Sequence, residues 1–350
     1  MGRRVRTAFC AVASVGAVML LAACTSSSGS SGSSSGNGPG GLTSAVLNPI
    51  PLGSAPVTSS ELQGAGVVLG KRFTGVGLPA PVFTPTSDGK LSMKVSANVP
   101  QDEIQALIGT ETLSIRPVVG TTQATTGRQF PDDNTAPGDD ATLLAQAKAQ
   151  VGDAAYKLAE SLTKTPTDQT SLTALAPFGG LTPNLVAVLP PDIQFHVPAI
   201  SCTQLDARNP YYLAADRFTS RQVVACDASE TTVKYLLGPS QLGGADVANA
   251  AASYDPVNYA SSGGWIVTVG FTADGQKKWA DFTDNMFESQ VAMLVGDLVV
   301  SAPVIQAQIL GPAIISGSDV NQQYAQQLAT YLNSGALTMA FTVSNYSAKS

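Results

Sequence analysis

Residues 263–317 read GGWIVTVGFTADGQKKWADFTDNMFESQVAMLVGDLVVSAPVIQAQILGPAIISG, and their hydrophobic pattern predicts three elements in succession. The first of these is a strand. Every second position in it carries an apolar side chain: Trp265, Val267, Val269 and Phe271. A period of two with β-branched and aromatic residues predicts a strand that buries one face.

A helix and a hairpin are predicted after this strand. Asp274 is a suitable N-cap for a helix over residues 275–286. The side chains that recur at helical spacing on one side of this helix are Trp279, Phe282 and Thr283. Two apolar runs, 291–295 and 298–304, are then separated only by Gly296-Asp297, a pair that favours the positive φ values of a tight turn.

The same stretch resembles the first extracytoplasmic domain of SecD, the accessory subunit of the preprotein translocase. In that family an apolar strand ends in Phe, a helix starts at Gly, and a hairpin leads into Ser-Ala-Pro and then Ile-x-Gly. The matching residues here are Phe271, Gly275, Gly296-Asp297, Val299 to Pro303, and Ile315 to Gly317. Gly-Asp replaces the family's usual Asp-Gly and keeps a two-residue turn.

Four further segments carry the resemblance. They are 71–78 (KRFTGVGL), 116–118 (RPV), 234–239 (KYLLGP) and 333–337 (NSGAL). Lys71 stands where the family usually has Asn. The resemblance is strong over 71–78 and 234–343 and weak from 120 to 200. The motif at 234–239 is close to actinobacterial SecD sequences, and its role is interpreted as architectural.

The resemblance implies an α+β fold, with a ferredoxin-like base subdomain and an inserted α+β head subdomain. Residues 42–119 and 318–344 are expected to form the base, and residues 120–317 the head. Within the head, 120–200 is divergent and 201–317 resembles the SecD head. SecD normally carries six membrane helices, whereas no such span is recognised here after the N-terminal signal, so membrane-driven movement of the head is not implied.

Local patterns predict several other elements. Residues 42–53 form a strand that Pro49 and Pro51 place at a sheet edge, because proline donates no backbone hydrogen bond. Ser59 or Ser60 is expected to cap a helix that runs through Phe73. Other expectations are an amphipathic helix over 141–165 with a weak point at Gly152, an irregular proline-rich segment over 179–198, and a helix from Asp319 to Gly335.

The composition excludes several classes of protein. Of the 350 residues, 44% are hydrophobic and 13% charged, which is too apolar for general disorder and too evenly mixed for a multi-span membrane protein. The net charge is −6, and it falls to −9 without the three arginines of the N-terminal signal. Because phosphate binding needs clustered Lys and Arg, we expect no nucleic-acid partner.

The N-terminus has the pattern of a lipoprotein signal peptide over residues 1–23. Arginines precede an apolar run from about residue 7 to 21, which is shorter than the roughly 20 residues that span a bilayer. Leu21-Ala22-Ala23-Cys24 then matches the lipobox of bacterial lipoproteins, which implies lipidation of Cys24. Residues 24–41 are rich in Ser and Gly and predict a flexible tether of roughly 20–25 Å. The alternative is an ordinary secretory signal with an incidental cysteine.

Only two of the four cysteines lie outside the N-terminal region. Exported cysteine pairs usually oxidise, so we expect a disulfide between Cys202 and Cys226, and two buried free thiols are the alternative. In the chain-entropy model the bond contributes roughly 3 kcal/mol. A metal site is not expected, because His196 is the only histidine and no metal-ligand spacing is present.

No enzyme chemistry is expected. A Ser-His-Asp set would need His196, which lies in a proline-rich segment without a Gly-x-Ser-x-Gly elbow. Residues 64–71 fail both glycine-rich phosphate-binding spacings, and the acidic residues near 132–140 lack the order of a calcium loop. We therefore expect neither a cofactor nor a metal.

Two functional hypotheses remain. The first is a lipoprotein anchored through Cys24 on the extracytoplasmic face of the cell membrane, a non-catalytic accessory in protein export that binds exported polypeptide or a Sec translocase component. The second is an envelope lipoprotein that reuses this fold to bind a ligand or another partner, because fold does not fix function. An apolar pocket would favour a ligand, whereas an exposed sheet edge or groove would favour extended polypeptide. Trp265, Phe271 and Trp279 are the candidate partner surface.

Overall fold

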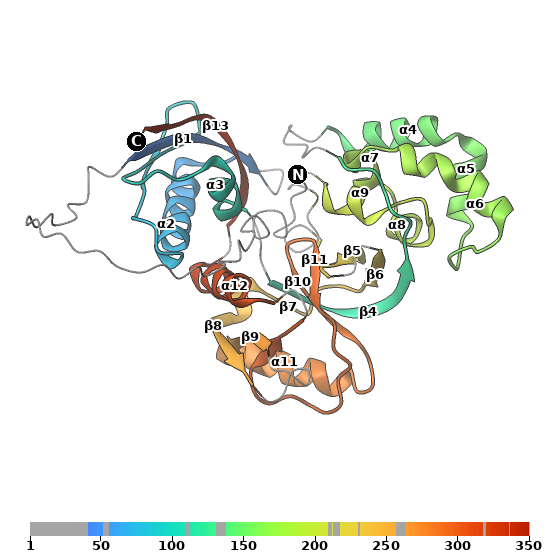
Figure 1. Ribbon diagram of the computed structural model, residues 1–350. Helices are drawn as coiled ribbons and strands as arrows, with labels where there is room; N and C mark the ends of the chain where they lie inside the picture. Colours follow the sequence, from blue (N-terminus) through green and yellow to red (C-terminus); the bar gives the residue numbers. More distant parts are fainter. Residues whose placement is uncertain are drawn as a thin grey trace, which may run out of the picture.

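The computed structural model describes residues 41–51, 56–109, 113–130, 138–208, 212, 218–229, 232–256, 264–317, 320–335 and 337–349. These residues form three β-sheets with helices on their faces, an α+β fold as expected (Figure 1). The signal peptide, Cys24 and most of the tether lie outside the described residues.

The first sheet has the ferredoxin-like strand order β13-β1-β3-β2, with every neighbouring pair antiparallel. Its inner face packs on the helices through a core that includes Leu47, Leu69, Phe73 and Met93. The elements are β1 (Leu42–Pro51), α2 (Ser59–Gly75), β2 (Val82–Pro85), β3 (Leu91–Val95), α3 (Gln101–Leu107) and β13 (Met339–Lys349). The rest of the described chain is inserted between α3 and β13, which confirms the predicted architecture of a base with an inserted head.

The position of β1 corrects one prediction. We expected an edge strand because of Pro49 and Pro51, but β1 lies between β13 and β3. The reason is that β3 pairs only with residues 43–47 of β1, so the proline-containing end has a partner on one side only. Proline is tolerated there because the side without a strand needs no donor.

The second sheet closes on itself. Its order is β10-β11-β5-β6-β4-β7, and β10 also pairs with β4, which closes the first five strands into a ring with β7 paired to β4. The strands are β4 (Leu113–Gln123), β5 (Val223–Asp227), β6 (Val233–Leu237), β7 (Leu242–Gly243), β10 (Val291–Val295) and β11 (Leu298–Ser301). β4 begins within the range expected for the base, yet it pairs in this sheet; the division of the chain at residue 119 stays a prediction.

Side chains alternate across this closed sheet. One set, which includes Ala225, Leu237 and Leu294, forms a small core inside it. The residues that directly precede these three point outward. Val224 and Leu236 face the helices that precede β5, whereas Met293 of β10 faces the third sheet. The closed sheet therefore joins two larger cores on opposite sides.

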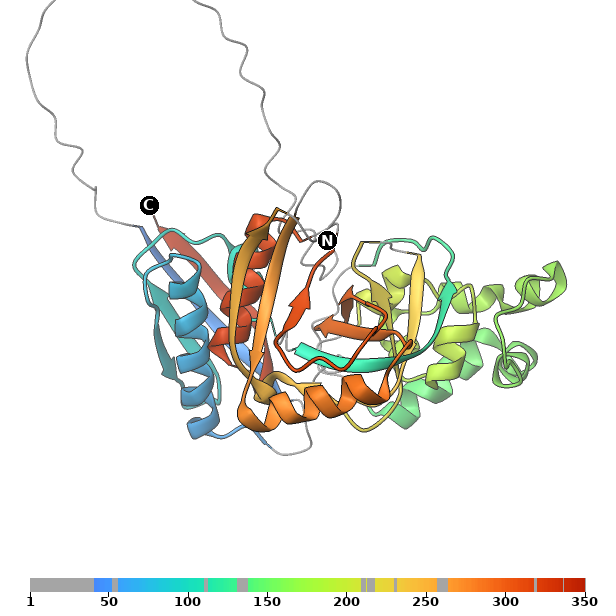
Figure 2. The same ribbon diagram turned by 90° about the horizontal axis from the view of Figure 1, so that it is seen from below.

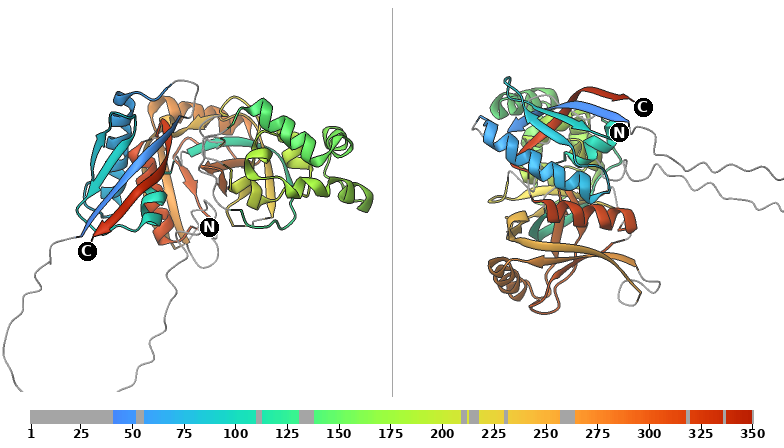
Figure 3. Two further views of the ribbon diagram at one scale, coloured as in Figure 1. Left: turned by 90° about the horizontal axis from the view of Figure 1, so that it is seen from above. Right: turned by 90° about the vertical axis from the view of Figure 1, so that its left-hand side faces the viewer.

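Helices between β4 and β5 gather at the end of the molecule away from the base (Figure 3). They are α4 (Asp140–Val151), α5 (Asp153–Glu160), α6 (Gln169–Leu175), the 3-10 helix η1 (Ala176–Gly180), α7 (Pro183–Ala187), α8 (Pro191–His196) and α9 (Cys202–Asp206). Gly152, at φ 85°, breaks the predicted long helix into α4 and α5. Residues 179–198 were expected to be irregular, but Pro183 and Pro191 each start a helix, because proline is well suited to the first helical position.

The third sheet has the order β12-β9-β8. It includes β8 (Val247–Asp255), β9 (Gly264–Phe271) and β12 (Ala313–Ile315), and the short helix η3 (Gly244–Asp246) precedes it. Two helices flank its core: α11 (Ala273–Asn285) and α12 (Gln322–Ser334). The predicted order of strand, helix and hairpin over 264–301 is confirmed.

α12 connects the base to the third sheet, and it lies between α2 and β8 in each view (Figures 1, 2 and 3). The buried guanidinium of Arg72 on α2 donates to Ser334 Oγ at 3.1 Å and to the carbonyls of Leu107 and Gly109. It also lies over the ring of Tyr331, 4.7 Å from the centroid. Arg72, which matches the SecD motif, thus fastens the ends of α3 and α12 to α2.

Three helix caps differ from those expected. Thr58 caps α2 in place of Ser59 or Ser60, and Thr272 caps α11 in place of Asp274. Asn321 caps α12, whereas Asp319 lies outside the described residues. Each side-chain oxygen accepts a backbone N–H of the first turn, which Ser, Thr, Asn and Asp can all do, so the sequence pattern alone placed the start within one to two residues.

Candidate functional site

The three residues of the predicted partner surface differ in their burial. Trp279 is fully buried in the core between the closed sheet and the third sheet, with its ring centroid 5.7 Å from that of Phe271. Its inclusion in a partner surface was therefore wrong, because a fully buried indole contributes packing and cannot touch a partner. Trp265 and Phe271 are partly buried and pack against the same core.

Trp265 reaches the surface beside a residue that the sequence analysis missed. Tyr254 lies directly opposite Trp265 across β8 and β9, and their ring centroids are 6.1 Å apart in an edge-to-face arrangement. The Tyr254 side chain is 53% exposed. Because large, rigid aromatic side chains dominate the energetics of protein interfaces, this pair is the candidate contact surface, and we call it the aromatic pair.

The edge of β8 is blocked at one register. Asn333 of α12 donates its Nδ2 to the carbonyl of Ala250 at 2.8 Å, and its Oδ1 accepts the Ala250 N–H at 2.8 Å. The amide thus occupies both backbone groups that an added strand would need there. A polypeptide at the aromatic pair is therefore expected to bind mainly through side chains, rather than by extending the sheet through Ala250.

A disulfide links the helices to the closed sheet. Cys202 of α9 and Cys226 of β5 are joined, with a Cα–Cα distance of 5.8 Å. Both cysteines are fully buried. This agrees with the predicted pairing, and it fixes α9 to the strand that it covers.

A buried ion pair joins Arg208, two residues after the end of α9, to Asp297 in the turn between β10 and β11. Arg208 Nη2 is 3.0 Å from Asp297 Oδ2 and also donates to the carbonyl of Val224. Asp297 is the turn residue of the β10–β11 hairpin, and its charge also acts on Arg116 of β4. Burial lowers the pKa of Arg116 to about 10 despite that favourable charge.

The motif at 234–239 has an architectural role. Lys234 is completely buried, and its Nζ donates to the carbonyls of Gln194 and Val197 at 2.9 Å and of Ile200 at 3.2 Å. These carbonyls lie at the end of α8 and in the turn that follows it, where a cation is favoured. Gly238 approaches Pro117 so closely that a Cβ would lie 2.7 Å from Pro117 Cγ.

Replacing Lys234 by methionine is expected to lower the free energy of unfolding by about 1–3 kcal/mol near neutral pH, because the three carbonyls lose their donor. Burial lowers the pKa of Lys234 to about 7. The folded protein therefore binds fewer protons than the unfolded chain between pH 7 and the ordinary lysine pKa, so wild-type stability should rise across that window.

Urea unfolding of wild type and Lys234→Met at several pH values between 7 and 10 tests both parts. The stability difference between the two proteins should widen as the pH rises. A difference that stays constant would show that Lys234 does not titrate in this range in the folded state.

His196 ends α8 and lies next to Phe195. Its ring lies edge-on to that of Phe195, and its buried Nδ1 has no hydrogen-bond partner among them. Burial lowers its pKa, and the charge of Lys234 acts in the same direction while Asp192 opposes it. The part of the chain that the structure describes also contains no group of three or more His, Cys, Asp or Glu side chains placed to bind a metal ion. Within the described ranges, no helix has both the length and the hydropathy needed to span a bilayer.

Comparison with known proteins shows a similarity that is concentrated in the head subdomain. Residues 220–339 match the family model of the SecDF P1 head subdomain. SecD from Streptomyces coelicolor, a protein translocase subunit, is 36% identical over 157 residues, which cover 43% of this chain and 26% of that protein. SecD from Mycobacterium tuberculosis is 34% identical over 122 residues, which cover 34% of this chain and 20% of that protein.

The chain is therefore similar to SecD, and the similarity to the P1 head subdomain covers residues 220–339. It spans about a quarter or less of the length of these two relatives. A crystal structure of SecDF in its super-membrane-facing form aligns with 88% of this chain and 30% of that chain, at 20% identity and a TM-score of 0.49. The resemblance stated from the motifs is confirmed.

Proposed function

We propose that this protein is a non-catalytic accessory in protein export that is anchored by a lipid at Cys24 and acts on the extracytoplasmic side of the cell membrane. The observation that carries the proposal is the P1 head match over residues 220–339, since the matched relatives are protein translocase subunits. The lipobox at 21–24 and the Ser/Gly-rich tether support the anchor.

The aromatic pair supports binding of exported polypeptide or a translocase component. Tyr254 and Trp265 offer an exposed ring and a partly buried ring at the end of the β8–β9 hairpin. Unfolded exported chains present apolar side chains that fold away later, and a rigid aromatic surface can bind such side chains without sequence specificity. The second hypothesis is an envelope lipoprotein that binds a ligand or another partner, and an enclosed apolar site would favour the ligand.

In-cell photocrosslinking from position 254 tests this proposal. A photoreactive amino acid replaces Tyr254 in one strain and Val119 in another; Val119 is a matched control because its side chain is 54% exposed and lies on β4. Exported precursors or translocase subunits should crosslink to position 254 and not to position 119. Equal labelling at both positions, or recovery of cell-wall enzymes and other lipoproteins alone, would contradict the proposal.

A further inference from the structure

Among the residues that the structure describes, helices cover only one face of the base sheet. Its inner side chains, among them Ala45 and Met93, are buried against α2 and α3. Residues directly opposite each other on neighbouring strands point to the same face, and the pairs Leu42–Lys349, Ser44–Lys94 and Val82–Lys94 link the opposite face across four strands. We call the face that carries these residues the outer face.

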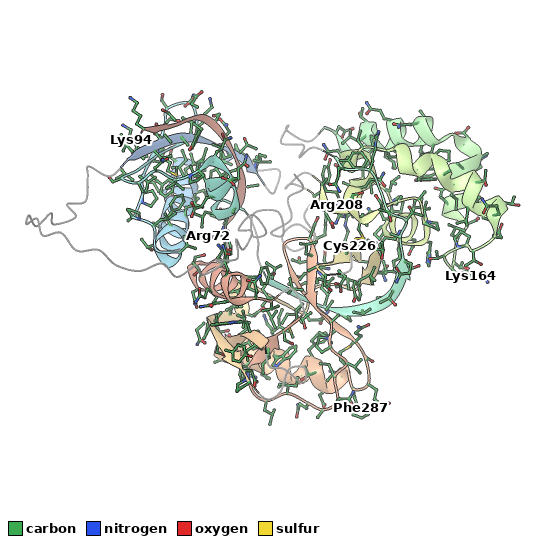
Figure 4. The ribbon with its side chains drawn as sticks, in the orientation of Figure 1. Arg72, Lys94, Lys164, Arg208, Cys226 and Phe287 are labelled. Atoms are coloured by element: carbon green, nitrogen blue, oxygen red, sulfur yellow. A yellow bond between two sulfur atoms is a disulfide. The ribbon has the colours of Figure 1, made fainter. Side chains whose placement is uncertain are left out.

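The outer face differs in charge from the rest of the protein. The whole chain has 25 acidic and 19 basic residues, yet β1, β2, β3 and β13 contain no Asp or Glu. Lys94 and Lys349 are exposed on this face, and Figure 4 shows Lys94 on the outer side of the sheet. Leu42 is 47% exposed and Val82 66%. Cations and apolar side chains are thus exposed together without acidic neighbours on these strands.

The position of the lipid anchor indicates what covers this face. Leu42 begins β1 on the outer face, and 17 residues separate it from Cys24. A flexible coil of that length spans roughly 20–25 Å, so a lipid at Cys24 would hold the sheet close to the bilayer. Anionic headgroups attract lysine, and exposed leucine and valine can enter the interfacial layer.

We propose that the outer face of the base sheet rests on an anionic bilayer surface, with Lys94 and Lys349 at the headgroups and Leu42 and Val82 among them. This inference rests on the proposed lipid anchor. Each lysine near such a surface raises the equilibrium constant for resting on the bilayer by about a factor of five. Reversing both charges should therefore lower the ratio of bilayer-bound to detached orientations by roughly twenty-five-fold or more.

Lipid quenching from two matched positions tests the orientation. The lipidated full-length mature chain carries a fluorophore at Val82→Cys or, as control, at Val67→Cys. Val67 is the same residue type, is 62% exposed and lies on α2, on the other side of the sheet. Each protein is reconstituted in phosphatidylethanolamine–phosphatidylglycerol vesicles that contain headgroup-quencher lipids. Quenching should be several-fold stronger at position 82, and K94E together with K349E should abolish the difference.

The outcomes separate this inference from the proposed function. Co-flotation with vesicles combined with equal quenching at both positions, or stronger quenching at position 67, would overturn the orientation and leave the anchor intact. If the mature chain does not float with vesicles, and Cys24→Ala changes nothing in cell fractionation, then the anchor is refuted and the orientation with it. A strong preference for position 82 that persists when phosphatidylcholine replaces the anionic lipid would refute the role of the two lysines.

Discussion

Replacing Asp297 by alanine is expected to lower the free energy of unfolding by about 3–5 kcal/mol. Asp297 pairs with Arg208 at 3.0 Å where both side chains are almost completely buried. Its carboxylate also favours the charged form of the buried Arg116. Without it, two guanidinium groups remain in a poorly solvated site and lose the charge of this carboxylate, whereas the carbonyls of Val224 and Gly238 are neutral acceptors.

Urea unfolding followed by far-UV circular dichroism measures this loss, with Asp281→Ala as control. Asp281 carries the same charge but is exposed on α11, so its removal should change stability by less than about 0.5 kcal/mol. Asp297→Asn keeps a hydrogen-bond acceptor but no charge. Its decrease in the free energy of unfolding should fall between those of the other two variants. A loss below about 1 kcal/mol for Asp297→Ala would mean that the arginines find other compensation.

The turn that holds Asp297 could be predicted from the sequence, but the partner of Asp297 could not. The tight turn at Gly296-Asp297 follows from two flanking apolar runs, and Gly296 has the expected positive φ of 61°. The partner of Asp297, however, lies about ninety residues earlier in the chain. The parallel pairing of β11 with β5 and the packing of α9 on β5 bring Arg208 to that turn. The predicted disulfide indicates the second of these contacts, but the strand pairing has no local signature.

Local sequence patterns predicted the buried face of a single strand or helix better than the contacts between different elements. The strand around residues 265–271 was predicted to bury one face, and Val267 and Val269 on that face are fully buried. The proline-rich segment was misjudged because the same residue breaks a helix in its interior and starts one at its first position. Tyr254 was missed because its contact with Trp265 depends on the register between β8 and β9, and the alanine-rich β8 lacks a strong strand pattern.

Replacing Trp279 by alanine is expected to lower the free energy of unfolding by about 3–5 kcal/mol, because it removes the largest fully buried side chain and leaves a cavity. The indole lies beside Phe271 and Phe282, with ring centroids 5.7 and 6.4 Å away, in the core beneath the third sheet. Little relaxation is expected, since strands of two sheets and both flanking helices meet in this core.

The matched comparison is Tyr254→Ala, which should cost less than about 1 kcal/mol, since half of that side chain is already in solvent. Thermal and urea unfolding give the stability of both variants. Chemical crosslinking of exported polypeptide to surface lysines such as Lys277 and Lys278 on α11, which leaves position 254 free for substitution, gives their binding. A core role for Trp279 requires a large loss of stability, whereas a contact role for Tyr254 requires lost crosslinks at nearly unchanged stability. The reverse result, a stable Trp279→Ala protein that no longer crosslinks, would restore Trp279 to the partner surface and contradict its burial.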